Sequence, residues 1–284
     1  MIEKLIIGIQ NTLCTFLTCN QDILNEYSLI EEILKIKFNE INRLKTDCFH
    51  IDELKYFLRD ITFCTDEQVE ELLTQIFIKK YIPNQALDIK KITTIQNSKS
   101  EAWGYSYESI YLFGDSLIKS DIKYASWPFE QLINQVLDRH RNNLVINYYS
   151  WLNQYEWSND DASHRFALAI YHAYENNIDY DIDVSITAYE MNVDNLKKLL
   201  GQYELFILNT NILYKITNLI PNKETYVTCE LIDENAIIGF DKSNFYSGKI
   251  IELFKKYDQK FILNFNSYVE NLLSNQEKFK SNKH

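Results

Sequence analysis

The spacing of hydrophobic residues predicts a helical first part of the chain. In residues 1–82, hydrophobic side chains recur every three or four positions between charged residues, as they do in amphipathic helices. Thr65 and Gln68 form a capping box, which predicts a helix that starts there and ends before Pro83. We therefore expect a helical N-terminal region at residues 1–84, with a boundary at residues 81–84.

The helical period is lost in residues 85–125. Gly104 and Gly114 interrupt an aromatic stretch there, so we expect one or two strands in this part of the chain. Pro128 then predicts the first turn of a helix that extends to Leu137, because proline is favoured at the start of a helix.

Strand-like patterns follow. Residues 144–146 are a short β-rich run, and residues 178–186 alternate strictly between apolar and polar side chains, which predicts a half-buried strand. A short helix is expected at residues 194–200, with Gly201 as its C-cap. The order of strand, helix and strand places a small mixed-sheet core at residues 85–201.

Residues 202–284 predict a further α/β layer. The expected elements are a strand at 205–208, a hairpin formed by 226–232 and 236–240, a helix at 247–257, a strand at 261–265 and a final helix at 268–279. The fold class is therefore α+β or α/β, with a helical region at 1–84, the core at 85–201 and an accessory region at 202–284.

Composition narrows the range of functions. The chain has 284 residues, of which 46% are hydrophobic and 24% charged, as in an ordinary globular protein. With only 6 glycines, the chain contains neither of the usual glycine-rich nucleotide loops. The net charge of −11 disfavours general nucleic-acid binding and suits a basic protein partner.

Cysteine usage and hydropathy bear on location. The number of cysteines is odd and none are spaced CxxC, so we expect buried thiols in a reducing cytosol; they are Cys14, Cys19, Cys48, Cys64 and Cys229. The chain shows no secretory signal pattern and no run of 18 uncharged apolar residues. We therefore expect a cytoplasmic protein without a membrane span.

Reactive side chains gather most densely just before an apolar helix that starts at Phe166. The first N–H groups of a helix and its dipole favour a phosphate or carboxylate. Ser163 can cap the helix or bond an anion, His164 can transfer a proton, and Arg165 can bind phosphate oxygens. Asp160 and Asp161 suit this place if they hold Mg²⁺ or if one of them acts as a general base.

A purely structural interpretation stays open. Asp161 or Ser163 is then a plain N-cap, which stabilises the helix by about 1 kcal/mol, and His164 and Arg165 pair with nearby acids.

A second cluster precedes the motif. Arg139, His140 and Arg141 either complement the negative end of a helix dipole or form a second phosphate clamp that faces the motif. Five aromatic residues that follow this cluster are expected in the core or a lid, with base stacking as the alternative; they are Tyr148, Tyr149, Trp151, Tyr155 and Trp157.

The run Asp161-Ala162-Ser163-His164-Arg165 resembles the DGxHR-type box of the ParB/sulfiredoxin-like superfamily. The resemblance implies a box that closes a strand and opens a helix, with a nucleoside triphosphate and Mg²⁺ bound at this turn. Ala162 stands where the superfamily usually has glycine, which matters if the position requires a positive φ. Glu130 and Glu156 are the candidates for the glutamate that the superfamily carries ahead of the box.

Two classes of function follow. The first is a nucleotide-binding protein that acts as a phosphotransferase or NTP hydrolase at residues 161–165, with Asp161, His164 and Arg165 as catalytic groups. The alternative is an acidic, non-enzymatic interaction protein of the inhibitor or immunity type. A nuclease of the same fold is a third hypothesis, against which the net charge speaks.

Overall fold

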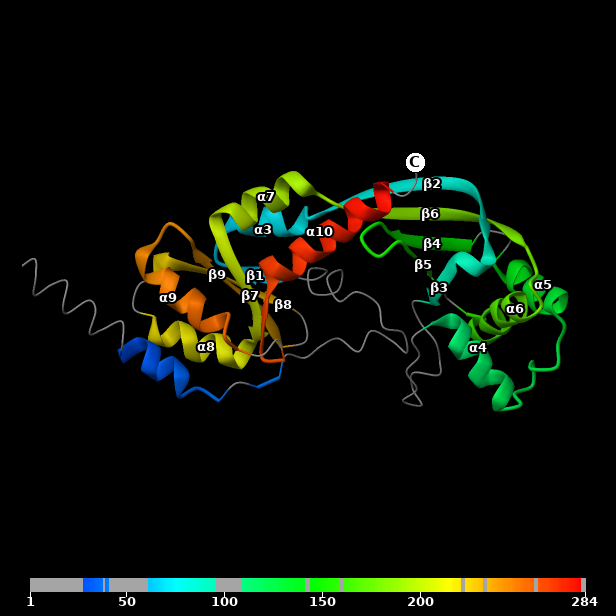
Figure 1. Ribbon diagram of the computed structural model, residues 1–284, viewed down its shortest axis with the longest axis horizontal. Helices are drawn as coiled ribbons and strands as arrows, with labels where there is room; N and C mark the ends of the chain where they lie inside the picture. Colours follow the sequence, from blue (N-terminus) through cyan, green and yellow to red (C-terminus); the bar gives the residue numbers. More distant parts are fainter. Residues whose placement is uncertain are drawn as a thin grey trace, which may run out of the picture. The chain divides into compact units, whose positions relative to one another are not determined.

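The computed structural model describes residues 28–37, 39–40, 61–95, 109–140, 144–158, 161–220, 223–231, 234–257 and 260–281 (Figure 1). These residues fall into two compact units. Unit 1 contains the described residues within 1–42, 60–70 and 198–268, and unit 2 those within 71–197 and 269–284.

Unit 1 is built on a five-stranded antiparallel sheet in the order β1-β8-β9-β7-β10. The strands are β1 (Ile61–Cys64), β7 (Tyr203–Asn209), β8 (Tyr226–Leu231), β9 (Asn235–Asp241) and β10 (Ile262–Asn264). The helices are α7 (Val193–Gln202), which continues from unit 2, α8 (Thr210–Leu219) and α9 (Phe245–Phe254), with the short η3 (Lys223–Thr225) before β8.

One face of this sheet forms the core of unit 1. Phe206 and Leu208 of β7 and Ile238 of β9 lie on that face, where they pack with buried residues of α8 and α9. Every residue of β7 is buried, which agrees with the continuous apolar run that predicted a strand at 205–208. The predicted hairpin at 226–240 is confirmed by the antiparallel pairing of β8 with β9.

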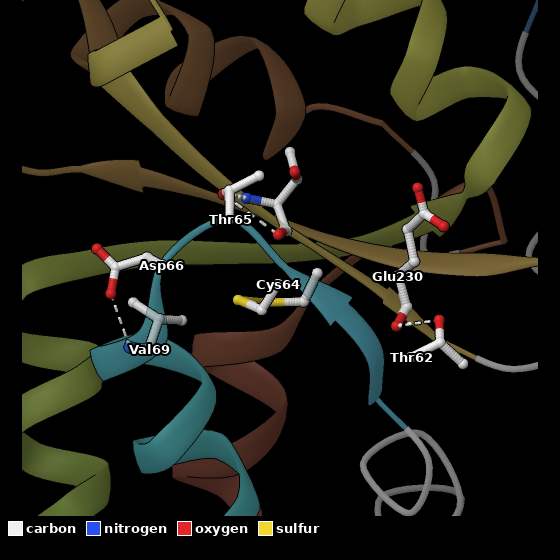
Figure 2. The surroundings of a disulfide bond; sticks show 8 residues. Thr62, Cys64, Thr65, Asp66, Val69 and Glu230 are labelled. Carbon is white, nitrogen blue, oxygen red and sulfur yellow. Dashed lines mark hydrogen bonds between the residues drawn. A yellow bond between two sulfur atoms is a disulfide. The ribbon is translucent and has the colours of Figure 1, made fainter.

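Cys64 and Cys229 lie directly opposite each other on β1 and β8 and form a disulfide (Figure 2). The expectation of free thiols is therefore wrong for these two residues. Sequence spacing could not reveal the pair, because 165 residues separate the two cysteines and only the strand register brings them together. Cys14, Cys19 and Cys48 lie outside the described residues.

The buried carboxylate of Glu204 on β7 is held by three partners. Lys255 Nζ lies 2.7 Å from Oε1 and Lys242 Nζ lies 3.2 Å from Oε2, while the Asn264 amide donates to Oε1 at 2.9 Å. Burial by itself raises the pKa of Glu204, but the hydrogen bonds from Lys255, Asn264 and Lys242 outweigh it and lower the net pKa below its ordinary value.

Acid is therefore expected to remove a stabilising contribution from Glu204. Because the folded pKa lies below the unfolded one, this contribution is present above the unfolded pKa of about 4.3 and is lost as the pH falls through the folded pKa. Urea unfolding between about pH 6 and pH 3 should show a steeper loss of stability for wild type than for Glu204→Gln. Glu190→Gln, which removes an exposed pair with Lys280, is the control and should match wild type. Parallel pH profiles for wild type and Glu204→Gln would contradict this assignment.

Unit 2 contains a mixed five-stranded sheet in the order β2-β6-β4-β5-β3. The strands are β2 (Phe77–Asp88), β3 (Ile92–Ile95), β4 (Leu144–Tyr149), β5 (Gln154–Trp157) and β6 (Asp181–Met191). Pairs β2·β6 and β4·β5 are antiparallel, whereas β4·β6 and β3·β5 are parallel. The strands predicted at 144–146 and 178–186 correspond to β4 and β6.

Two helices of unit 2 pack against a third (Figure 1). This is α6 (Ser163–Glu175), which packs against α4 (Ile110–Lys119) and α5 (Phe129–Arg139). The predicted helix after Pro128 is confirmed as α5. The remaining elements are α3 (Glu67–Thr74), which begins in unit 1, the short η1 (Ile89–Lys91), and α10 (Phe265–Ser281), which continues from unit 1. No helix among the described residues is both long enough and apolar enough to cross a lipid bilayer.

The helix predicted up to Pro83 is shorter than expected. It ends at Thr74, and Phe77–Asp88 form the long strand β2. The register of β2 against β6 shifts between Ile82 and Gln85, where Asn84 has φ 53°, so the proline lies in a β-bulge and not at a domain boundary. A bulge tolerates proline because the ladder is already interrupted there.

One of the strands expected in residues 85–125 is found as β3, whereas the aromatic stretch around Gly114 is not a strand, because Ile110–Lys119 form helix α4. The side chain of Ser109 caps this helix by accepting a hydrogen bond from Leu112 N at 3.3 Å. Gly114 is a contact point with α6: a Cβ atom at this position would lie 2.5 Å from the carbonyl oxygen of Ala167. Gly201, expected as a C-cap, lies inside α7, which continues to Gln202.

Candidate functional site

The candidate site is the turn at residues 161–165, here called the α6 turn, which follows β5 and opens α6. Ala162 is the N-cap of α6, with φ 75° and ψ 17° in the left-handed region. A residue with a Cβ atom is disfavoured in that conformation, and glycine adopts it readily. Ala162 therefore occupies a position at which glycine would be less strained.

Asp161 is fixed by contacts on both sides of the turn. Its Oδ1 accepts a hydrogen bond from Ala162 N at 2.6 Å, and its carboxylate forms an ion pair with Arg139 at the end of α5. His140 Nε2 lies 3.1 Å from the carbonyl oxygen of Asp161 and, as a donor, closes a second link from α5. The structure thus brings Arg139 and His140 to the motif.

Arg165 lies along α5 one turn before Arg139. Its Nη1 is 3.5 Å from Gln135 Oε1, and its guanidinium carbon lies 5.6 Å from the centre of the Tyr124 ring. Gln135 and Arg139 are four residues apart and share one face of the helix, so two arginines lie along this face. Nothing in the sequence pattern marked Gln135 or Tyr124 as partners of Arg165.

The other residues of the motif are closely packed. Ser163 is buried at the first position of α6, and the ring of His164 lies 5.5 Å from the ring of Phe113 on α4. Trp157 is fully buried. The centre of its ring lies 4.3 Å from the ring centre of Phe166 and 5.2 Å from that of His140. The indole of Trp157 therefore supports the α6 turn from inside the core, and it cannot offer a face to a base.

Glu156, one of the two candidates for the glutamate ahead of the box, lies in a buried polar cluster that the sequence pattern did not indicate. Glu156 has no exposed surface, and its Oε2 accepts hydrogen bonds from Tyr149 Oη at 2.6 Å and from Asn147 Nδ2 at 2.9 Å. Burial, followed by the charge of Glu156, raises the pKa of Tyr189. A signal existed in hindsight, since Asn147 and Glu156 are paired across β4 and β5, but it required the strand register.

Metal ligands do not gather at the α6 turn in the described part of the chain. No group of three histidine, cysteine, aspartate or glutamate side chains that could hold a metal ion occurs among the described residues. Asp160, which was predicted as a metal ligand, and Arg141, which was predicted to contact phosphate, lie outside them. The carboxylate of Asp161 is directed to Arg139, so these residues alone do not form a resident metal site.

Comparison with known proteins gives a family and no activity. No curated protein and no solved structure matches the chain. One family model matches residues 82–279, which include the α6 turn, all of β4, β5 and β6, and most of unit 1. That stretch is more than half of the chain, and the chain therefore belongs to the Family of unknown function (DUF6685).

Proposed function

We propose that the junction of α5 and α6 binds the phosphate group of a nucleotide. The observation that carries this proposal is the approach of Arg139 and His140, from the end of α5, to the turn that opens α6. Arg165 adds a second guanidinium along the same face of α5. Arginine side chains beside the first N–H groups of a helix are a common environment for phosphate.

The carboxylate of Asp161 marks the place that an anion would take. It accepts a backbone N–H at the start of the helix and pairs with Arg139, and both contacts are of the kind that a phosphate oxygen makes. The Asp161 and Arg139 side chains are 36% and 51% exposed, and ion pairs that exposed contribute only about 0–1 kcal/mol. A phosphate with more charge can therefore replace the carboxylate at little cost.

The fold around the turn supports the proposed relationship with the ParB/sulfiredoxin-like superfamily. A strand that ends at Trp157, a left-handed residue at 162 and a helix from Ser163 form the arrangement that the DGxHR-type box implies. We propose that the core of unit 2 is of this type.

We assign the site to binding and not to a chemical step. The carboxylate of Asp161 is engaged by Arg139 and by Ala162 N, and Mg²⁺ would arrive with a nucleoside triphosphate, coordinated mainly by its phosphates. Phosphoryl transfer or hydrolysis by Asp161, His164 and Arg165 stays a prediction from the resemblance.

Thermal unfolding with ATP, CTP, GTP and inorganic triphosphate, each with and without Mg²⁺, tests the proposal. A ligand at 100 times its dissociation constant should stabilise the protein by about 2.7 kcal/mol. Arg139→Ala and Arg165→Ala should each weaken binding about tenfold or more, because a hydrogen bond to a charged group contributes about 1.5–3 kcal/mol. Lys119→Ala removes an exposed positive charge on α4 and should leave affinity unchanged. If no nucleotide stabilises wild type, the proposal fails.

Asp161→Asn separates two roles for this residue. The amide keeps the acceptor for Ala162 N but removes the negative charge that competes with phosphate. Without Mg²⁺, we expect the variant to bind triphosphate more tightly than wild type. If Asp161 instead holds the metal, the variant will bind more weakly in the presence of Mg²⁺ and show no gain in its absence.

A further inference from the structure

The disulfide between Cys64 and Cys229 is produced by strand pairing in unit 1. Cys64 is the last residue of β1 and is directly opposite Cys229 of β8. Their Cα atoms are 4.0 Å apart, nearer than the spacing of about 4.5 Å that is usual for the closer pairs of facing residues in antiparallel strands. The sulfur atoms are therefore adjacent because of the register of the sheet.

Hydrogen bonds hold this register independently of the sulfur atoms. Thr65 N donates to the carbonyl oxygen of Thr228 at 2.9 Å, and Thr228 N donates to Thr65 Oγ1 at 2.9 Å. Thr62 Oγ1 donates to the carbonyl oxygen of Glu230 at 3.2 Å on the other side of Cys64 (Figure 2). Two reduced thiols would thus stay opposite each other, ready to form the bond again.

The two cysteine residues differ in exposure. Cys229 has no exposed surface, whereas Cys64 is partly exposed at the end of an edge strand. Thiol–disulfide exchange needs a thiolate that reaches one sulfur along the S–S bond, and the partly exposed residue is therefore the one at which we expect attack.

We propose that Cys64 and Cys229 are a reversible thiol–disulfide exchange site, with Cys64 as the exchanging sulfur and a small-molecule thiol and its disulfide as co-reactants. In the reducing direction, an external thiolate attacks Cys64 Sγ, the S–S bond breaks, and Cys229 leaves as a thiolate that takes up a proton. A second external thiolate then attacks the external sulfur of the mixed disulfide and releases Cys64. Two electrons pass from the external thiols, which become a disulfide, to the cysteine pair.

The consequence of exchange falls on β1. Among the described residues, β1 is an edge strand that pairs with β8 alone. The disulfide ties this four-residue strand to the sheet covalently, and reduction leaves it held by hydrogen bonds only. Exchange is therefore expected to control how stably β1 stays paired with β8 at the edge of this sheet.

The first experiment equilibrates the folded full-length protein in buffers of varied ratios of reduced to oxidised glutathione. After acid quench and alkylation, peptide mapping by mass spectrometry reports the oxidised fraction of the pair. We expect that fraction to change smoothly and reversibly with the ratio while circular dichroism stays native. A pair that exchanges only in urea, or never forms a disulfide at any ratio, would overturn the proposal.

The second experiment uses the single variants Cys229→Ser and Cys64→Ser with oxidised glutathione. Cys64 in the first variant should form a mixed disulfide at least about tenfold faster than Cys229 in the second, because only Cys64 is accessible. Equal rates, or a faster reaction at Cys229, would remove Cys64 as the exchanging sulfur.

Hydrogen exchange gives a readout that does not depend on a variant. On reduction of wild type, the amides of residues 61–64 should exchange about tenfold faster or more, while those of β7 stay unchanged as the internal control. Unchanged exchange at β1 would show that the disulfide does not control the edge of the sheet.

Discussion

Replacing Phe206 with alanine is expected to lower the free energy of unfolding by about 3–5 kcal/mol. Phe206 lies at the middle of β7 with no exposed surface. Its ring packs edge-on against Phe254 of α9 and Phe240 of β9, with ring centres 5.1 Å and 6.3 Å apart, respectively. Alanine would leave a cavity where the sheet of unit 1 meets its helices, and the loss is measurable by urea unfolding followed by circular dichroism.

Phe63→Ala is the matched control, because it makes the same change on the same sheet at a side chain that is 55% exposed. It should change stability by only about 0.5 kcal/mol. Phe206→Leu keeps most of the apolar volume and should cost about 1.5 kcal/mol. If Phe206→Ala and Phe63→Ala were equally costly, Phe206 could not be at the centre of this core.

Gly114→Ala is expected to destabilise the protein by about 1–3 kcal/mol, although alanine is the better helix former. The new Cβ atom would lie 2.5 Å from the carbonyl oxygen of Ala167 and 2.7 Å from Tyr171 Cβ, so α4 and α6 would have to separate. The nearer contact is with backbone, which cannot rotate away. Differential scanning calorimetry or urea unfolding would measure the change.

Gly248→Ala is the comparison that shows how the same substitution changes stability where there is room for the methyl group. Gly248 is an exposed residue inside α9, and a Cβ atom there would meet nothing within 4 Å. This substitution should stabilise the protein by up to about 1 kcal/mol through helix propensity. A stabilising effect at both glycines would mean that α4 and α6 are not in close contact at Gly114.

The elements that the sequence predicted correctly have patterns set by their own residues. The strict alternation at 178–186 led to β6, and the apolar run at 205–208 led to β7. The errors at β2 and α4 share a cause, which is that Pro83 and Gly114 were interpreted as interruptions. Pro83 is accommodated by a bulge and Gly114 by the close approach of α6, and both are tertiary effects that local pattern does not encode.

At the candidate site, too, two of the local elements could be predicted from the sequence, whereas the tertiary contacts could not. The sequence placed the motif after the strand at 144–146 and before a helix, and both elements are found as β4 and α6. The strand directly before the motif is β5, which the sequence pattern did not indicate. The partners of its side chains were beyond reach, because Arg165 meets Gln135 and Tyr124 through the packing of α5 on α6. Likewise, the buried pairing of Glu156 depends on which residue of β4 lies opposite it.

The pairing of β1 with β8 also means that β1 is synthesised well before the strand with which it pairs. Cys64 is made 165 residues before Cys229, and at 5–20 residues per second that interval is roughly 10–30 s. During that time β1 has left the ribosome without its partner strand, and its exposed N–H and C=O groups are open to other chains. The first strand of this sheet therefore waits for the third of its five strands in chain order, and a chaperone that binds nascent chains can act in that interval.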